Sequence, residues 1–246
     1  MMKVIVNGAL GYMGREVMKC VNAGVQNSTL AAAVDYNGGT DGVYRSLFEF
    51  TGEADVIIDF SNHTAAPELM QYACKRGLPV VIATTGHTEE ELAIIDAAAK
   101  EIPIFKSGNM SVGVALLTKL AKQAAAVFGD SDIEIIETHH NRKLDAPSGT
   151  ALMLADAIRE VRPESNYVYG REGRCKREPE DITIHAVRMG NVVGQHEIFF
   201  ATNSQTISLK HEAHDRALFA DGAMPAAAFL IGKPAGMYNM DDLLDF

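Results

Sequence analysis

Residues 3–14 read KVIVNGALGYMG, and they are the clearest local indication of how the N-terminal part of the chain folds. Residues 3–6 form a β-branched run that predicts a strand, and apolar residues at helical spacing over 12–21 predict a helix. Three glycines lie between strand and helix, namely Gly8, Gly11 and Gly14. Because glycine has no Cβ, backbone N–H groups at such a turn can approach a pyrophosphate. The stretch therefore predicts a dinucleotide-binding unit.

Asp35 supplies the acidic partner of this turn. It follows a second predicted strand, residues 29–34, at the point where a carboxylate can hydrogen-bond a ribose hydroxyl. A carboxylate there repels a 2′-phosphate, and Tyr36 comes next instead of an arginine, so the pattern favours NADH. Arg45 or another nearby cation leaves NADPH open. The glycine spacing is GxxGxxG, one residue longer than usual, so a turn that binds nothing is the alternative.

Further apolar runs predict the rest of an α/β fold. They cover residues 55–60, 79–83 and 102–105, and helical segments separate most of the strands. This alternation predicts a mainly parallel sheet with helices on both faces. Thr88 and Glu91 fit a capping box and predict a helix start. The loops after the fourth and fifth strands carry small polar residues that suit a nicotinamide and its ribose.

The pattern changes near residue 112, which predicts a second, α+β domain. We expect a helix over 112–128, a strand over 132–136, and an antiparallel pair formed by 197–201 and 206–210. Periodicity predicts a last helix over 215–231. Gly222 and Pro225 are expected to end one segment of that helix and begin another.

A polar block follows the strand that begins the second domain. Residues 137–150 read ETHHNRKLDAPSGT. Histidine titrates near neutral pH, so His139 or His140 is a candidate proton donor, and Lys143 supplies fixed positive charge. The PSGT sequence at 147–150 predicts a helix start, whose N–H groups offer an anion site. Together these groups suit a small dicarboxylate.

Structural interpretations compete with the chemical ones in this block. Glu137 is most simply a partner of Lys143 or of a backbone group, and Asp145 begins a turn. His139 and His140 would point to opposite faces of a continuing strand, so we expect only one to transfer a proton. No third ligand at a suitable spacing supports a metal site. The remaining histidines are expected to be surface or internally satisfied residues: His63, His87, His185, His196, His211 and His214.

Composition excludes several classes of protein. The chain has 246 residues, 47% hydrophobic and 22% charged, which is typical of a folded globular protein of one or two domains. Its net charge of −10 argues against a nucleic-acid surface. Its three cysteines are too far apart for a disulfide framework or zinc site, which favours a reducing cytoplasm. No apolar stretch is long enough to predict a membrane span.

The whole chain resembles the 4-hydroxy-tetrahydrodipicolinate reductase family, also called dihydrodipicolinate reductase, of bacterial lysine biosynthesis. The block at 137–151 carries the family pattern E-x-H-H-x-x-K-x-D-A-P-S-G-T-A without a break, and GNMSVGV at 108–114 and FADGA at 219–223 extend the resemblance. It implies reduction of a cyclic hydroxylated dicarboxylate by NAD(P)H with loss of water. Two departures are Tyr36, where many relatives carry a basic residue, and Ala83, where glycine often precedes TTG.

The resemblance also implies roles for individual residues. His139 matches the general acid, and Lys143 matches a second proton donor and carboxylate partner. Substrate binding is implied for His140, Ser148, Gly149 and Thr150. Cofactor binding is implied for Gly8, Ala9, Leu10, Gly11, Tyr12, Met13, Asp35, Ala83, Thr84, Thr85, Gly108, Asn109 and Met110.

Family likeness further implies a division of the chain. Residues 1–112 and 220–246 would form a Rossmann-like dinucleotide-binding domain, and residues 113–219 a substrate-binding domain on an open mixed sheet. Four chains would associate through that second sheet. Two alternatives are another NAD(P)-dependent amino-acid or semialdehyde dehydrogenase on the same fold, and a non-catalytic dinucleotide sensor. The intact block at 137–151 argues against both.

Overall fold

The computed structural model describes residues 1–244 and divides into two compact units. Unit 1 contains Met1–Ser111 together with the described residues from Ala217 onward, and unit 2 contains Val112–Arg216. The chain therefore leaves unit 1 once and returns to it. The sequence-based expectation places these boundaries at residues 112–113 and 219–220.

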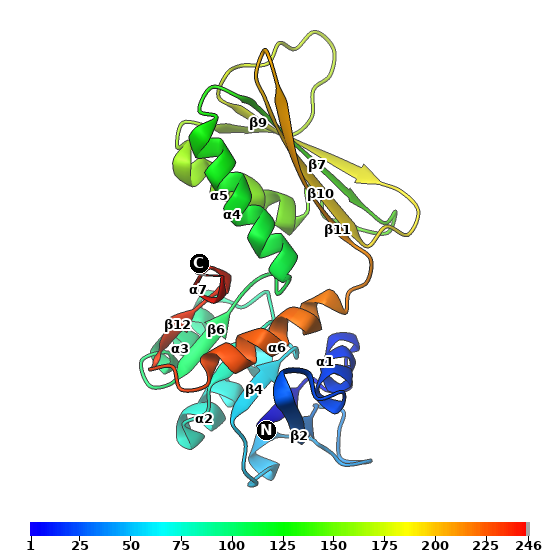
Figure 1. Ribbon diagram of the computed structural model, residues 1–246. Coiled ribbons are helices and arrows are strands. Elements are labelled where there is room, and N and C mark those ends of the chain that lie inside the picture. Colours follow the sequence, from blue (N-terminus) through cyan, green and yellow to red (C-terminus); the bar gives the residue numbers. More distant parts are fainter. Residues whose placement is uncertain (245–246) are drawn as a thin grey trace. The chain divides into compact units, whose positions relative to one another are not determined.

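Unit 1 is built on a seven-stranded parallel sheet (Figure 1). Its strands are β1 (Met2–Asn7), β2 (Ser28–Val34), β3 (Val43–Tyr44), β4 (Val56–Asp59), β5 (Val80–Ile82), β6 (Pro103–Lys106) and β12 (Gly236–Tyr238). Their spatial order is β12-β6-β5-β4-β1-β2-β3. The order therefore reverses between β1 and β4, and open parallel sheets bind ligands at the carboxyl ends of the strands beside such a switch point.

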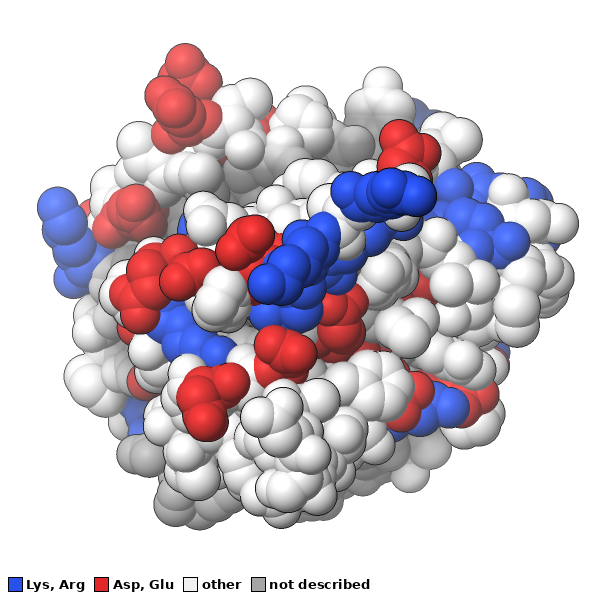
Figure 2. All heavy atoms as spheres, turned by 90° about the horizontal axis from the view of Figure 1, so that it is seen from above, with Lys and Arg blue, Asp and Glu red and all other residues white. Residues whose placement is uncertain are grey.

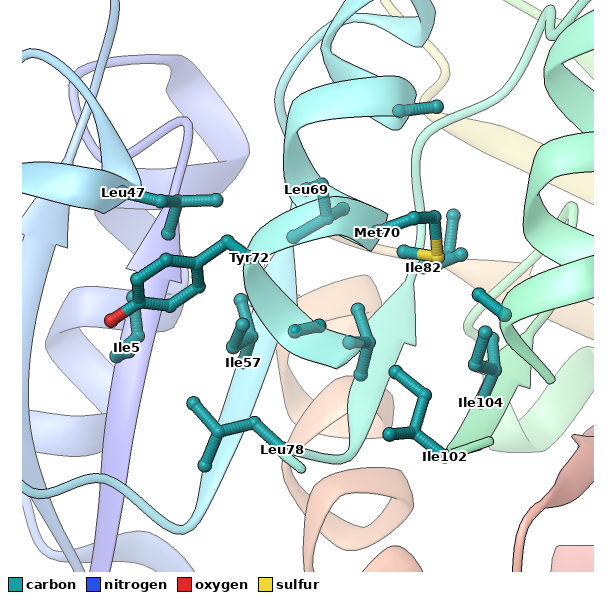
Figure 3. Packing of buried hydrophobic residues seen from close by; sticks show 14 of the residues in the cluster. Ile5, Leu47, Ile57, Leu69, Met70, Tyr72, Leu78, Ile82, Ile102 and Ile104 are labelled. Carbon is teal, nitrogen blue, oxygen red and sulfur yellow. The ribbon is translucent and has the colours of Figure 1, made fainter. Parts of the chain in front are cut away.

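Helices bury both faces of this sheet. They are α1 (Tyr12–Asn22), α2 (Ala66–Arg76), α3 (Glu89–Ala98), α6 (Leu218–Leu230) and the short α7 (Met240–Leu243), with 3-10 turns at Val25–Asn27, Leu47–Glu49 and His63–Ala65. Alternate residues of β1 point to opposite sides, yet Val4, Ile5 and Val6 are all fully buried. Figure 3 shows Ile5 packed with Ile57, Leu69 and other apolar side chains of the α2 side. The predicted capping box at Thr88 is confirmed.

The prediction that Gly222 and Pro225 separate two helical segments is wrong. Helix α6 is continuous from Leu218 to Leu230 with Pro225 inside it. An internal proline costs about 3 kcal/mol, because it removes a backbone hydrogen bond and crowds the preceding turn. Burial of one large apolar side chain returns about 1.5–3 kcal/mol, and both Met224 and Leu230 are fully buried here. The burial of the apolar side chains of α6 therefore outweighs the tendency of Pro225 to interrupt the helix.

Unit 2 is a five-stranded mixed sheet with helices on one face (Figure 1). Its helices are α4 (Val112–Val127) and α5 (Gly149–Val161), and its strands are β7 (Asp132–His139), β8 (Asn166–Val168), β9 (Asp181–Arg188), β10 (Gly194–Ala201) and β11 (Thr206–Ala213). The order is β11-β10-β7-β9-β8, and β10 runs antiparallel to β7 and β11. The predicted fold class and the predicted antiparallel pair are confirmed.

The stretch between α5 and β9, for which the sequence offers no motif, contains β8 and two arginines that pair with neighbouring strands. Arg171 pairs with Glu134 and Asp181, and Arg177 pairs with Asp132. This segment is thereby tied to β7 and β9.

The surface carries charged side chains of both signs. On the face seen in Figure 2, both blue Lys and Arg side chains and red Asp and Glu side chains occur, and several of the blue ones gather from the centre toward the upper right. Within residues 1–244, no helix is long and apolar enough to cross a membrane.

Candidate active site

A cavity of about 590 Å³ opens in unit 1 at the carboxyl ends of β1, β2 and β4. Its walls include Gly8 and Gly11 after β1, Asp35 after β2, and Ser61 after β4. Arg45 lines the same cavity. The position is the switch point of the sheet, so the cavity lies where an open parallel sheet holds a dinucleotide.

Two glycines of the turn are required by the close approach of backbone segments. Gly8 has φ of +82°, and a Cβ there would lie 2.4 Å from the carbonyl oxygen of Phe60. A Cβ on Gly14 would lie 2.0 Å from the carbonyl oxygen of Gly8. The N-terminus of α1 carries no side-chain cap and no acidic residue in its first turn. The turn therefore fits a pyrophosphate at an uncapped helix N-terminus.

The Asp35 carboxylate is held by the backbone on both sides. Oδ2 accepts a hydrogen bond from the Leu10 N–H at 3.0 Å, and Oδ1 accepts one from the Asn37 N–H at 2.9 Å. Each carboxylate oxygen keeps a further lone pair, so a ribose hydroxyl can still donate to it. Tyr36 is 91% exposed beside this carboxylate, and Arg45 donates through Nε to the carbonyl of Gly38.

Asp59 is an organising residue that the sequence analysis missed. It ends β4, is 2% exposed, and accepts hydrogen bonds from Asn7 at 2.7 Å, Ser61 at 2.6 Å and Thr84 at 2.6 Å. Burial raises its pKa, and the three donors oppose that effect. The residue ties together the loops after β1, β4 and β5. In the sequence, the feature that could have pointed to Asp59 is its position as an acidic residue at the end of the apolar run DVIID.

The other predicted cofactor residues lie in the same turn or in the loops after β5 and β6. The Ala9 N–H donates to the Val34 carbonyl, so it is already used within the protein. Leu10 and Tyr12 are exposed, Met13 is half-buried, and Met110 is buried. The remaining residues follow the carboxyl ends of β5 and β6: Ala83, Thr84, Thr85, Gly108 and Asn109.

Glu137 is the centre of the polar cluster in unit 2. Its side chain is fully buried on β7. Oε2 accepts from His139 Nδ1 at 2.5 Å and from Arg188 at 2.9 Å, while Oε1 accepts from Arg188 at 2.7 Å and from the Ser148 N–H at 3.1 Å. Burial alone would raise the pKa of Glu137, but the hydrogen bonds from His139 and Arg188 lower it to about 2. Glu137 is therefore a carboxylate that orients the imidazole of His139.

The expected pairing of Glu137 with Lys143 is wrong, whereas the expected backbone partner is present. Lys143 pairs with Asp145 at 2.9 Å, and Arg188 is the cation that holds Glu137. Arg188 also donates to the Asp145 carbonyl. Strand register explains the difference, because β9 runs parallel beside β7 and brings Arg188 next to His139. Nothing in the local sequence of the block predicts this contact.

The two adjacent histidines have different environments. His139 is the last residue of β7 and is 9% exposed. Its Nε2 faces Gly194, where a Cβ would lie 3.1 Å away. His140 lies beyond the strand, and its buried Nδ1 has no hydrogen-bond partner among the described residues. The strand thus fixes His139, while His140 keeps a polar atom that a ligand could satisfy.

The predicted helix start at Ser148 is confirmed. Ser148 is the N-cap of α5, and its Oγ accepts from the Ala151 N–H at 3.3 Å. Gly149 is exposed and has open space where a Cβ would stand, and half-buried Thr150 follows it. The helix therefore begins at a point that a carboxylate can approach, where the first N–H groups have no intrahelical acceptor.

His196 is a buried member of this cluster, a role that the sequence did not indicate for it. It lies on β10, is 4% exposed, and its Nε2 is 3.1 Å from Ser148 Oγ. Its ring packs edge-on to that of His139 with centroids 5.2 Å apart. Burial lowers its pKa to about 4, and the charge of His139 adds to the effect. The feature that could have predicted the burial of His196 is its place on the buried face of β10, since every second residue of that strand is buried, including Ile198 and Phe200.

Comparison with known proteins identifies the family. Residues 2–110 match the family "Dihydrodipicolinate reductase, N-terminus", and residues 113–244 match "Dihydrodipicolinate reductase, C-terminus". The chain belongs to the dihydrodipicolinate reductase family. The predicted family and the predicted class of enzyme, an oxidoreductase, are thereby confirmed.

Individual relatives are similar over the full chain. The 4-hydroxy-tetrahydrodipicolinate reductase of Caldanaerobacter subterraneus subsp. tengcongensis is 49% identical over 99% of this chain and 98% of its own. The Clostridium tetani enzyme of the same name is 42% identical over 100% of this chain and 98% of its own. The dipicolinate-bound dihydrodipicolinate reductase from Paenisporosarcina sp. TG-14 superposes with a TM-score of 0.82 at 26% identity, covering 99% of both chains.

Proposed function

We propose that this protein reduces 4-hydroxy-tetrahydrodipicolinate to tetrahydrodipicolinate in lysine and diaminopimelate biosynthesis. The substrate loses water, and the resulting conjugated imine takes up a hydride and a proton. The observation that carries the proposal is the buried Glu137–His139 pair beside the Ser148 helix start, in a chain 49% identical to a reductase of that name. NAD(P)H supplies the hydride when it is bound.

Each polar group of the cluster has a part in this chemistry. His139, oriented by Glu137, is the general acid. Lys143 exchanges its pairing with Asp145 for a substrate carboxylate and is the second proton donor. The other carboxylate partners are His140, Ser148, Gly149 and Thr150. This set matches a small dicarboxylate, the class of the dipicolinate bound to the relative from Paenisporosarcina.

NADH is the proposed preferred cofactor. Asp35 places a negative charge where NADPH carries its 2′-phosphate, and exposed Tyr36 offers no cation. The positive charge that could oppose this preference is Arg45, which lines the same cavity. The loop from Gly8 to Met13 would hold the pyrophosphate, and the loops containing Thr84 and Asn109 would hold the nicotinamide end.

A homotetramer in the cytoplasm completes the proposal. Helices α4 and α5 lie on one face of the unit 2 sheet, so the opposite face can bury area against other chains (Figure 1). The three cysteines are unpaired, which suits a reducing compartment. Light scattering should give four times the chain mass of 26.6 kDa, and a mass of one chain would contradict the tetramer.

Turnover tests the function and the cofactor together. Substrate is generated in place from pyruvate and aspartate semialdehyde by the preceding synthase, and absorbance of reduced nicotinamide is followed with NADH and NADPH in parallel. We expect a higher kcat/KM with NADH. Equal or better use of NADPH would overturn the cofactor preference, and binding of either cofactor without turnover would overturn the function.

A further inference from the structure

Ser148 Oγ has three hydrogen-bonding positions, and two are already occupied. A hydroxyl offers one proton and two lone pairs. One lone pair accepts from the Ala151 N–H as the cap of α5, at 3.3 Å. The second contact is with His196 Nε2 at 3.1 Å. Whether Ser148 can donate to a substrate therefore depends on which of these two residues supplies the proton to their shared hydrogen bond.

The burial of His196 decides between the two arrangements. If Ser148 donates to Nε2, His196 carries its proton on Nδ1, and Nδ1 is buried without a partner among the described residues. A buried N–H without an acceptor is rarer and more costly than an unused acceptor. If Nε2–H donates instead, only a lone pair at Nδ1 is left unsatisfied. Burial also lowers the pKa of His196, so the ring is neutral with a single proton at neutral pH.

We infer that His196 is a positioning residue: its Nε2–H donates to Ser148 Oγ and so directs the Ser148 hydroxyl proton toward a substrate carboxylate. With the opposite tautomer, Ser148 would present a lone pair to that carboxylate and repel it. His196 thereby controls substrate affinity without touching substrate. This inference rests on the proposed function, because it assumes that Ser148 binds a dicarboxylate.

A double-mutant cycle in the full-length enzyme tests this coupling, with dipicolinate as the probe. A hydrogen bond to a carboxylate accounts for about a tenfold to hundredfold change in affinity. Ser148→Ala and His196→Leu should each raise the inhibition constant of dipicolinate and the KM by about tenfold, while kcat falls less than about threefold. His196→Gln should restore affinity to within about threefold of wild type, since its amide N–H can replace Nε2–H. In the Ser148→Ala background, His196→Leu should add less than about twofold.

The outcomes separate this inference from the proposed function. Full additivity of the two changes, or glutamine as poor as leucine, overturns the role of His196 while the function stands. Wild-type enzyme that neither binds dipicolinate nor turns over substrate overturns both. If His196→Leu does not fold, ¹⁵N spectra of histidine-labelled wild type decide the matter at neutral pH. Protonation of His196 at Nε2, with its signals assigned by their absence from the His196→Gln spectrum, supports the inference, and protonation of His196 at Nδ1 refutes it.

Discussion

Replacing Glu137 by glutamine isolates the carboxylate that orients His139. Glutamine keeps the shape but loses the charge, so Arg188 stays half-buried without its anion. Breaking a buried ion pair costs about 3–5 kcal/mol, which corresponds to roughly 6–20 °C in Tm for a chain of this size. The charged hydrogen bond between Glu137 and His139 contributes about 1.5–3 kcal/mol, so kcat should fall about ten- to hundredfold.

Glu134→Gln is the matched control. Glu134 lies on the same strand and also contacts a histidine, His185, at 2.7 Å and an arginine, Arg171, at 3.0 Å. It is partly exposed, so we expect a smaller loss of Tm and a kcat within about twofold of wild type. The assay is NADH oxidation at saturating substrate, with Tm measured on the same preparations. A Glu137→Gln enzyme that is folded and keeps the wild-type kcat would refute the orienting role, as would equal losses in both variants.

Three further predictions concern the cofactor turn, the loop anchor and acid stability. Gly14→Ala forces a Cβ against the Gly8 carbonyl, so calorimetry should show NADH affinity falling at least about tenfold; unchanged affinity would contradict the close approach. Asp59→Ala removes the acceptor shared by Asn7, Ser61 and Thr84, so the KM for NADH should rise about tenfold while the inhibition constant of dipicolinate stays unchanged. A change in the dipicolinate inhibition constant alone would contradict the role of Asp59 as the anchor of the cofactor loops. Burial lowers the pKa of His196 from 6.5 to about 4, so between these pH values the histidine is protonated in the unfolded chain but neutral in the folded one. The free energy of unfolding should therefore fall by about 3 kcal/mol as the pH is lowered from above 6.5 to about 4. His196→Gln should therefore lose less Tm than wild type between about pH 7 and about pH 5, and an equal loss would show that His196 does not cause it.

Local sequence was sufficient for the elements whose signals lie close together in the chain. The capping box at Thr88 and the Ser148 helix start are formed by groups that lie within a few residues of one another. Strand β1 pairs with the distant strands β2 and β4, but its β-branched run and the glycine turn after it lie in one short stretch of sequence. Helix α6 was misjudged at Pro225, because its stability comes from burial and not from local preference.

The parts that could not be predicted depend on distant pairing. Arg188 reaches Glu137 across 51 residues, and Ser148 contacts His196 across 48, through the register of a mixed sheet. A single sequence shows which residues alternate on a strand but not which strand lies beside it. The polar residues of the block could therefore be recognised in the sequence, whereas their distant partners Arg188 and His196 could not.

The most direct measurement compares wild type with His139→Gln and Lys143→Ala for turnover and for cofactor binding. NADH oxidation is followed with substrate generated in place, and the NADH dissociation constant is measured by calorimetry on the same samples. Loss of a general acid reduces turnover by about 10²–10⁴-fold, so both variants should lose kcat to that extent and keep the wild-type NADH affinity. Wild-type kcat in either folded variant would contradict the assignment of proton transfer to the block at residues 137–150.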